Sequence, residues 1–106
     1  MKLIELIDYF RGEGSFDEFC TKNDLSTESE VIEIYAEQPV TLNSQLGFFP
    51  IEETHGRIEI GIGEKAYRNL FSFFYFLGAI DEARQIEDLG NEELAKKLFS
   101  YAINDA

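Results

Sequence analysis

The sequence has a single cysteine, Cys20, so the chain cannot form an internal disulfide. Its first residues have neither a basic segment nor a long apolar run followed by a small-residue cleavage site, which are the features of a secretory signal. Both observations are typical of a protein that stays in a reducing compartment. We therefore expect a cytoplasmic location.

Long hydrophobic runs are also lacking. The most apolar stretch, residues 70–80, has only about half of the roughly 20 residues that a membrane-spanning helix needs. Ser72 and Gly78 interrupt this stretch. The sequence therefore predicts a protein that is not embedded in a membrane.

Basic residues are scarce, because nine Lys and Arg stand against 21 Asp and Glu and leave a formal net charge of −12. Such a charge disfavours binding to DNA, RNA or anionic lipid and favours a basic partner. The imbalance is uneven. Seven acids and no base lie between Lys22 and Arg57, whereas the last fifty residues mix six bases with nine acids.

Apolar residues are plentiful enough to form a core. They make up 44% of the 106 residues, and ten of them are Phe. A chain of this length and composition folds without metal or disulfide cross-links. No repeat or linker divides it, so we expect one domain over residues 1–106.

Three segments have helical patterns. Residues 2–11 place apolar side chains at helical spacing and end at Gly12 and Gly14, which predicts a helix and its C-terminal turn. Ser15 and Glu18 have the spacing of a capping box before a short helix over 15–23. A last helix is predicted over 92–103, with Asn91 as its N-cap.

Residues 24–40, DLSTESEVIEIYAEQPV, allow two interpretations. Thr27 and Glu30 fit a capping box for a helix over 28–37. The β-branched and aromatic residues of VIEIY, followed by Gln38-Pro39, favour a strand instead. A strand would place Ile32, Ile34 and Ala36 on one face, and Val31, Glu33, Tyr35 and Glu37 on the other. That second face would expose two carboxylates and a phenol.

Two further patterns complete the expected fold. Residues 48–62 resemble two strands joined by a turn near 54–56, with Pro50 confining its strand to an edge or a bulge. Residues 65–86 have the length and polar ends of a central, nearly all-apolar helix. The sequence thus predicts an α+β fold in which a small antiparallel sheet of about three strands packs with four helices.

Residues that carry chemistry are sparse. His55 lies near Glu52 and Glu53, but neighbouring strand residues point to opposite faces and so do not share a metal site. Cys20 lies among acids that raise a thiol pKa, which indicates a buried apolar residue. The glycines of GIGEKAYRN lack the full phosphate-binding spacing and indicate a helix entry. We expect no catalytic residues, no metal and no cofactor, and therefore no enzyme.

Aromatic residues cluster at Phe71, Phe73, Phe74, Tyr75 and Phe76. Such a series is usually core. A single helix cannot turn five adjacent aromatics inward unless it is surrounded, so some of Phe73, Tyr75 or Phe76 are expected at the surface, where they could anchor a partner.

Four segments, in this order, resemble immunity proteins of bacterial polymorphic toxin systems, including those of contact-dependent growth inhibition. They are SFDEFC at 15–20, ESEVIEIY at 28–35, FFPIEET at 48–54 and YRNLFSFF at 67–74. The resemblance extends over about residues 1–85 and concerns order and character, since no invariant catalytic motif is shared.

The resemblance implies a protein that binds and blocks the effector domain of a cognate toxin, for which a basic nuclease is the expected class. The implied toxin-binding residues are Asp24, Glu28, Glu30, Glu33, Tyr35, Glu37, Glu52 and Glu53, with Tyr35 as the central aromatic contact. An alternative is a non-catalytic adaptor that binds a protein through exposed aromatics of the 67–77 helix. A small hydrolase is a third interpretation.

Overall fold

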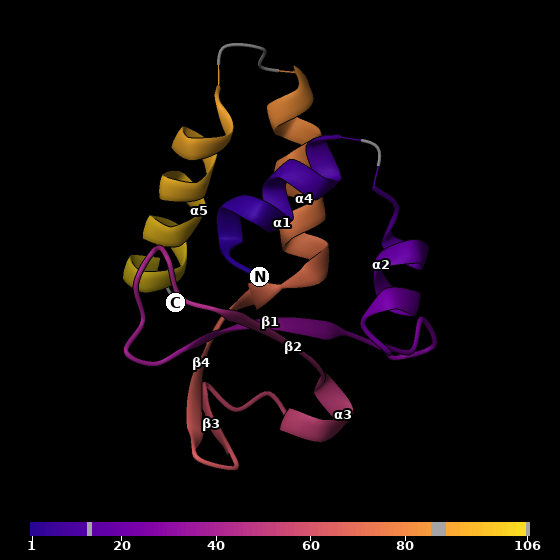
Figure 1. Cartoon of the computed structure of the whole chain (residues 1–106), viewed down its shortest axis with the longest axis vertical. Coiled ribbons are helices and arrows are strands. Elements are labelled where there is room, and N and C mark those ends of the chain that lie inside the picture. Colours follow the sequence, from indigo (N-terminus) through magenta and orange to yellow (C-terminus); the bar gives the residue numbers. More distant parts are fainter. Residues whose placement is uncertain (13, 86–88, 106) are drawn as a thin grey trace.

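The computed structural model contains one antiparallel sheet with the strand order β2-β1-β4-β3 (Figure 1). It describes residues 1–12, 14–85 and 89–105. The elements are α1 (Leu3–Arg11), α2 (Phe16–Lys22), β1 (Ile32–Glu37), β2 (Leu46–Pro50), α3 (Ile51–Thr54), β3 (Glu59–Ile62), β4 (Lys65–Ser72), α4 (Phe73–Gln85) and α5 (Asn91–Asp105). The predicted α+β class is confirmed, with four strands and five helices in the described ranges.

One face of the sheet is covered by α1, α2, α4 and α5, and this layer encloses the main core (Figure 1). The apolar stripe of α1 is buried, and β1 contributes Ile32, Ile34 and Ala36 from the sheet. Burying a Leu, Ile or Phe side chain stabilises a fold by about 1.5–3 kcal/mol. The helical layer therefore fixes which face of β1 points inward.

The predicted first and second helices are confirmed. The Ser15 Oγ accepts a hydrogen bond from the Glu18 N–H at 3.1 Å and caps α2. Gly12 ends α1 by donating its N–H to Asp8 O at 3.0 Å. At Gly14, two positions after Gly12, a Cβ would clash with the Tyr9 ring and lie 2.6 Å from Tyr9 O, so only glycine fits. The turn signals in this region were thus correctly placed.

Polar contacts join the ends of three helices. Arg11 of α1 donates to Leu89 O at 2.7 Å and to Asn91 Oδ1 at 2.8 Å. Arg84 of α4 donates to Phe10 O at 2.5 Å. The last helix is confirmed, but Asn91 is its first residue and not its cap, because Leu94 donates to Gly90 O. The Asn91 side chain instead bonds to Arg11 and to Asp8.

Residues 32–37 form a strand, so the strand interpretation of the acidic segment is confirmed over the helical one. β1 is a central strand that pairs with both β2 and β4. Glu33, Tyr35 and Glu37 alternate with the core residues and project from the second face of the sheet. This alternation follows the predicted register.

The predicted hairpin over residues 48–62 is wrong. β2 pairs with β1 and β3 pairs with β4, so the two segments lie at opposite edges of the sheet. Residues 51–58, called here the crossover, connect these edges across the second face and contain the helical turn α3. Pro50 lies on an edge strand, as predicted. β2 and β3 thus each pair with a central strand and not with each other.

The predicted helix over residues 65–86 is wrong in its first third. Residues 65–72 form β4, which continues directly into α4 without a loop, and the Ser72 Oγ accepts the Tyr75 N–H at 3.1 Å. Gly61 lies in β3, and Gly63, with a φ of 61°, begins the two-residue turn to β4. These glycines therefore form a hairpin and not a helix entry.

No helix in the described ranges combines the length and apolarity needed to cross a membrane.

Candidate functional site

The second face of the sheet holds a small aromatic cluster beneath the crossover. Tyr35 is fully buried and donates its hydroxyl to Arg57 O at 2.5 Å. Its ring contacts Phe49 with centroids 5.5 Å apart, and Phe49 contacts Tyr67 at the same distance. The expectation that Tyr35 lies on an exposed face is therefore wrong, because the crossover covers it.

Glu33 also lies partly beneath the crossover. Its Oε2 accepts a hydrogen bond from Asn69 Nδ2 at 2.5 Å. Its Oε1 is buried and has no hydrogen-bond partner among the described residues. Glu33 is half-buried, so its carboxylate is only partly accessible to solvent.

Glu37 lies near the other end of β1. Its Oε2 is 3.9 Å from Lys65 Nζ, and its side chain is 29% exposed. A partly exposed pair at this distance contributes little to stability. The two strand acids thus interact with groups of the chain itself.

The remaining predicted acids are exposed and lie together on one side of the molecule. Asp24, Glu28 and Glu30 belong to the α2–β1 loop, and Glu52 and Glu53 belong to α3. The Ser29 Oγ donates to Glu52 Oε1 at 2.5 Å, and the Glu30 N–H donates to Glu52 Oε2 at 3.2 Å. These bonds attach the loop to α3.

The same bonds stabilise the charged form of Glu52. The pKa of the Glu52 carboxyl is lowered by hydrogen bonds from the Ser29 hydroxyl, from the backbone N–H of Glu52 itself and from the Glu30 N–H. Glu52 is therefore ionised at neutral pH while it holds the loop in place. Its role is structural as well as electrostatic.

α2 adds acids that the sequence analysis did not assign to the surface. Asp17 and Glu18 are exposed residues of α2, and α2 lies on the same side of the molecule as α3 (Figure 1). Lys22 is the one base between residues 12 and 56, and its ammonium lies 5.9 Å from the centre of the Tyr9 ring. The signal was present in the sequence, because only Lys22 separates Asp17 and Glu18 from the acidic segment that has no Lys or Arg.

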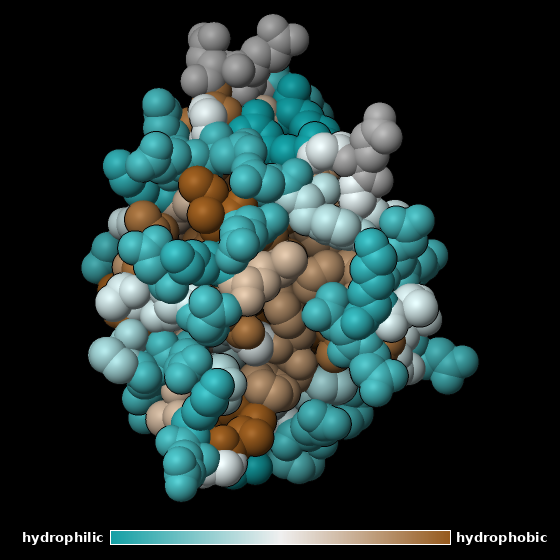
Figure 2. Space-filling model, in the orientation of Figure 1, coloured by the Kyte–Doolittle hydropathy of each residue, from teal (hydrophilic) through white to brown (hydrophobic). Residues whose placement is uncertain are grey.

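We call this set the acidic surface. It consists of Asp17, Glu18, Asp24, Glu28, Glu30, Glu52 and Glu53. Figure 2 shows hydrophilic side chains on the side where α2 and α3 lie in Figure 1, and apolar side chains at the centre of the same face. The five residues of β2 are all half-buried.

The candidates for other chemistry take structural positions. Cys20 is buried, and burial followed by the nearby Asp17 raises the pKa of its thiol. His55 is exposed at the end of α3 with a φ of 54°. No three His, Cys, Asp or Glu side chains in residues 1–12, 14–85 and 89–105 are placed to hold a metal ion.

The aromatic series divides between core and surface. Phe71, Phe73 and Phe76 are buried. Tyr75 is 39% exposed, which agrees with the expectation that some of Phe73, Tyr75 or Phe76 lie at the surface, and Phe74 is 61% exposed. Exposure is thus limited to the first turn of α4, where the helix leaves the sheet.

Comparison with known proteins found no relative. The chain matches no protein-family model, and neither a curated protein nor a solved structure is similar to it.

Proposed function

We propose that the chain is an immunity-type inhibitor that binds a basic toxin domain, of the nuclease class, through the acidic surface. The observation that carries this proposal is the gathering of seven exposed carboxylates on α2, the α2–β1 loop and α3, in a region of the sequence with Lys22 as its one base.

The energetic argument concerns like charges. Seven neighbouring carboxylates repel one another, and the net charge of −12 adds to this cost in the free protein. A basic partner removes the repulsion on binding. The same field accelerates association with a positive protein, which suits an inhibitor that must act before its toxin does.

The proposed contact surface differs from the eight residues that the resemblance implies. The proposed surface retains Asp24, Glu28, Glu30, Glu52 and Glu53. It adds Asp17 and Glu18. Glu33 and Glu37 contribute charge at the margin, because Asn69 and Lys65 already engage them. Tyr35 supports the crossover from beneath and makes no direct contact.

The experiment that tests this function is affinity capture from the native host at low salt, followed by washes of rising salt. The expected result is a basic protein, encoded beside this chain, that is released progressively as salt screens the contact. A neutral partner that survives the high-salt wash contradicts the proposal.

A matched pair of variants locates the contact. Glu28→Lys with Glu30→Lys reverses two exposed acids of the loop. Asp81→Lys with Glu93→Lys makes the same change in net charge on α4 and α5, away from α3 (Figure 1). The first variant should lose the captured protein, and the second should retain it. Equal loss in both would indicate a general charge effect with no defined surface.

The alternative adaptor function rests on Phe74. The helix predicted over residues 67–77 begins only at Phe73, and Phe74 in its first turn is 61% exposed. Large exposed aromatics are common anchors of protein interfaces. Phe74→Ala would weaken an adaptor contact at all salt concentrations, whereas it should leave an electrostatic contact at the acidic surface unchanged.

A further inference from the structure

β3 is an open edge of the sheet. Among the described residues it has one neighbouring strand, β4, and the two pair in a regular register from Glu59–Arg68 to Ile62–Lys65 (Figure 1). Its sequence, EIGI, has neither a lysine nor a proline, and its pairing has no bulge, although these are common devices that keep edge strands from pairing. Three of its four residues are exposed. β3 is therefore accessible to a further strand.

The opposite edge, β2, is partly closed. The Leu46 N–H donates to Met1 O at 2.8 Å, so the N-terminus occupies one backbone group of this strand. Pro50 has no N–H to donate to a neighbour. All five residues of β2 are half-buried. The comparison singles out β3 as the edge that remains available for pairing.

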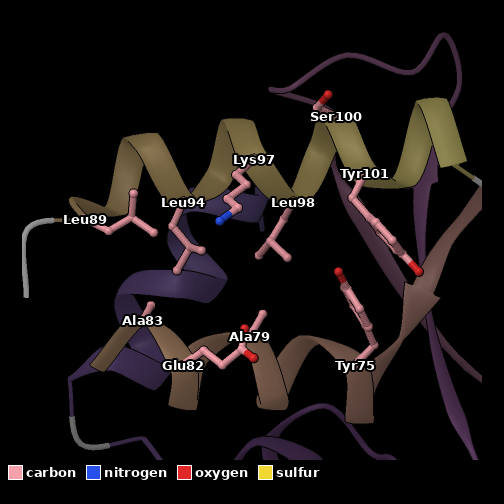
Figure 3. Close-up of a pocket in the computed structure, with 10 residues that line it drawn as sticks. All are labelled: Tyr75, Ala79, Glu82, Ala83, Leu89, Leu94, Lys97, Leu98, Ser100 and Tyr101. Atoms are coloured by element: carbon pink, nitrogen blue, oxygen red, sulfur yellow. The ribbon is translucent and has the colours of Figure 1, made fainter. Parts of the chain in front are cut away.

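Exposed apolar side chains occur in two different settings. Tyr75 of α4 and Tyr101 of α5 extend toward each other and stack with ring centroids 4.5 Å apart, so each covers part of the other (Figure 3). Ile58, just before β3, and Ile62, at its end, are 64% and 48% exposed. Ile60 lies between them on the same face, because side chains alternate along a strand. The edge therefore carries a row of three isoleucines on one face.

The backbone groups that face away from the sheet belong to Glu59 and Gly61. The Asn69 N–H of β4 donates to Ile58 O at 2.7 Å. Residues of an antiparallel strand bond to a given neighbour at every second position, so Ile58 and Ile60 direct their backbone groups to β4. Glu59 and Gly61 direct theirs outward. A strand that pairs with β3 must bond to these two residues.

We propose that β3 pairs antiparallel with β3 of a second copy of the chain, about a two-fold axis at Ile60. In this register the two Ile60 side chains are opposite each other, and Ile58 of each copy is opposite Ile62 of the other. The exposed isoleucines thus cover one another. Glu59 is opposite Gly61, so the outward backbone groups of these two residues bond to each other and the two acids are not directly opposed.

The pattern of β3 favours this register over its nearest alternative. A pairing centred on Gly61 would place the apolar Ile58 opposite the charged Glu64. The pairing centred on Ile60 instead matches apolar with apolar and an acid with a glycine. A second copy therefore supplies the strand that the edge requires. This interaction lies beyond the proposed inhibitor function and does not depend on it.

The size and charge of the contact predict a weak dimer. It involves about five residues of each copy, and interfaces this small lie at the weak end of protein association. The net charge of −12 on each copy adds repulsion. We expect a Kd between about 10 µM and 1 mM. Salt should strengthen the dimer by screening this repulsion, whereas salt should weaken the proposed contact with a basic partner.

Sedimentation equilibrium over this concentration range tests the dimer. The wild type should show a mass that rises toward twice that of the monomer. Ile58→Lys should raise Kd by about tenfold or more, because a charged edge residue opposes pairing. Phe74→Lys is the matched control, since it makes the same charge change at a side chain that is 61% exposed on α4, and it should dimerise as the wild type does.

Amide hydrogen exchange on the wild type tests the register without any substitution. The Glu59 and Gly61 N–H groups should exchange more slowly as the protein concentration rises, whereas that of Ile60, which already bonds to β4, should change little. A monomer at all concentrations, equal dimerisation by Ile58→Lys, or protection confined to other segments would each overturn the proposal. Loss of the dimer in Phe74→Lys alone would also overturn it and place the contact on α4.

Discussion

The acids of residues 24–53 form two groups that the fold treats differently. The strand acids, Glu33 and Glu37, project from the second face of the sheet and contact Asn69 and Lys65. The loop acids, represented by Glu28 and Glu30, stand in solvent on a loop attached to α3 through Glu52. One acidic segment of the sequence thus supplies strand acids that contact other side chains of the chain and loop acids that are exposed to solvent.

The difference follows from the path of the crossover. The crossover must carry the chain from the β2 edge to the β3 edge, and it does so over the second face. This covers Tyr35 and partly buries Glu33, whereas the α2–β1 loop lies outside its path. A run of charge therefore indicates a binding surface only where no other segment passes over it.

The largest effect is expected for Tyr35, which was predicted on an exposed face and is buried beneath the crossover. Tyr35→Ala removes a buried ring and should lower the free energy of unfolding by about 3–5 kcal/mol. Tyr35→Phe removes only the bond to Arg57 O and should cost about 0.5–1.5 kcal/mol. Urea unfolding measures both. A Tyr35→Ala variant as stable as the wild type would place the ring at the surface.

The next largest effect compares one acid of each group. Glu33→Ala leaves the half-buried Asn69 amide without its partner and should cost about 1–3 kcal/mol. Glu28→Ala changes an exposed side chain and should stay within about 0.5 kcal/mol of the wild type. Both values come from the same urea titration. Equal values for the two variants would remove the distinction between the groups.

A smaller effect is expected from salt. Because the net charge is −12, raising the ionic strength should stabilise the free protein, by about 1 kcal/mol or less. Glu28→Lys with Glu30→Lys should flatten this dependence, since it relieves repulsion within the acidic surface. Thermal melts over a series of NaCl concentrations make the comparison. An unchanged slope would mean that the loop acids are too dispersed to repel one another.

The smallest effect concerns acid. The pKa of Glu52 is lowered by folding, so its stabilising contribution is present above its ordinary value of 4.5 and is lost as pH falls through the folded-state value. Glu52→Gln should therefore make stability fall less steeply below about pH 4.5. Urea midpoints at a series of acidic pH values measure this. A Glu52→Gln profile parallel to that of the wild type would show that its bonds to Ser29 and Glu30 contribute nothing.

Local signals in the sequence predicted much of the helical layer and the central strand. Ser15 with Glu18 located α2, and the alternation of Ile32, Ile34 and Ala36 gave the face of β1 that points inward. These features depend on neighbouring residues, which a single sequence contains. The exposed acids of the loop could be found for the same reason.

Strand partners and coverings depend on distant residues and could not be predicted in the same way. Nothing in residues 48–62 indicates that β1 and β4 separate β2 from β3. The covering of Tyr35 follows from that topology. One local signal was available and was not used: Ser72 has a residue type suited to an N-cap, and its hydroxyl accepts the Tyr75 N–H where α4 begins.

The most direct test of the comparison is the dissociation constant for the captured basic partner, measured over a range of salt concentrations. Glu28→Lys with Glu30→Lys should raise Kd by about tenfold or more and flatten its salt dependence. Glu33→Gln with Glu37→Gln should leave both nearly unchanged. The opposite pattern, in which only the strand variant weakens binding, would contradict this placement. It would mean that the partner contacts the strand acids on the second face of the sheet.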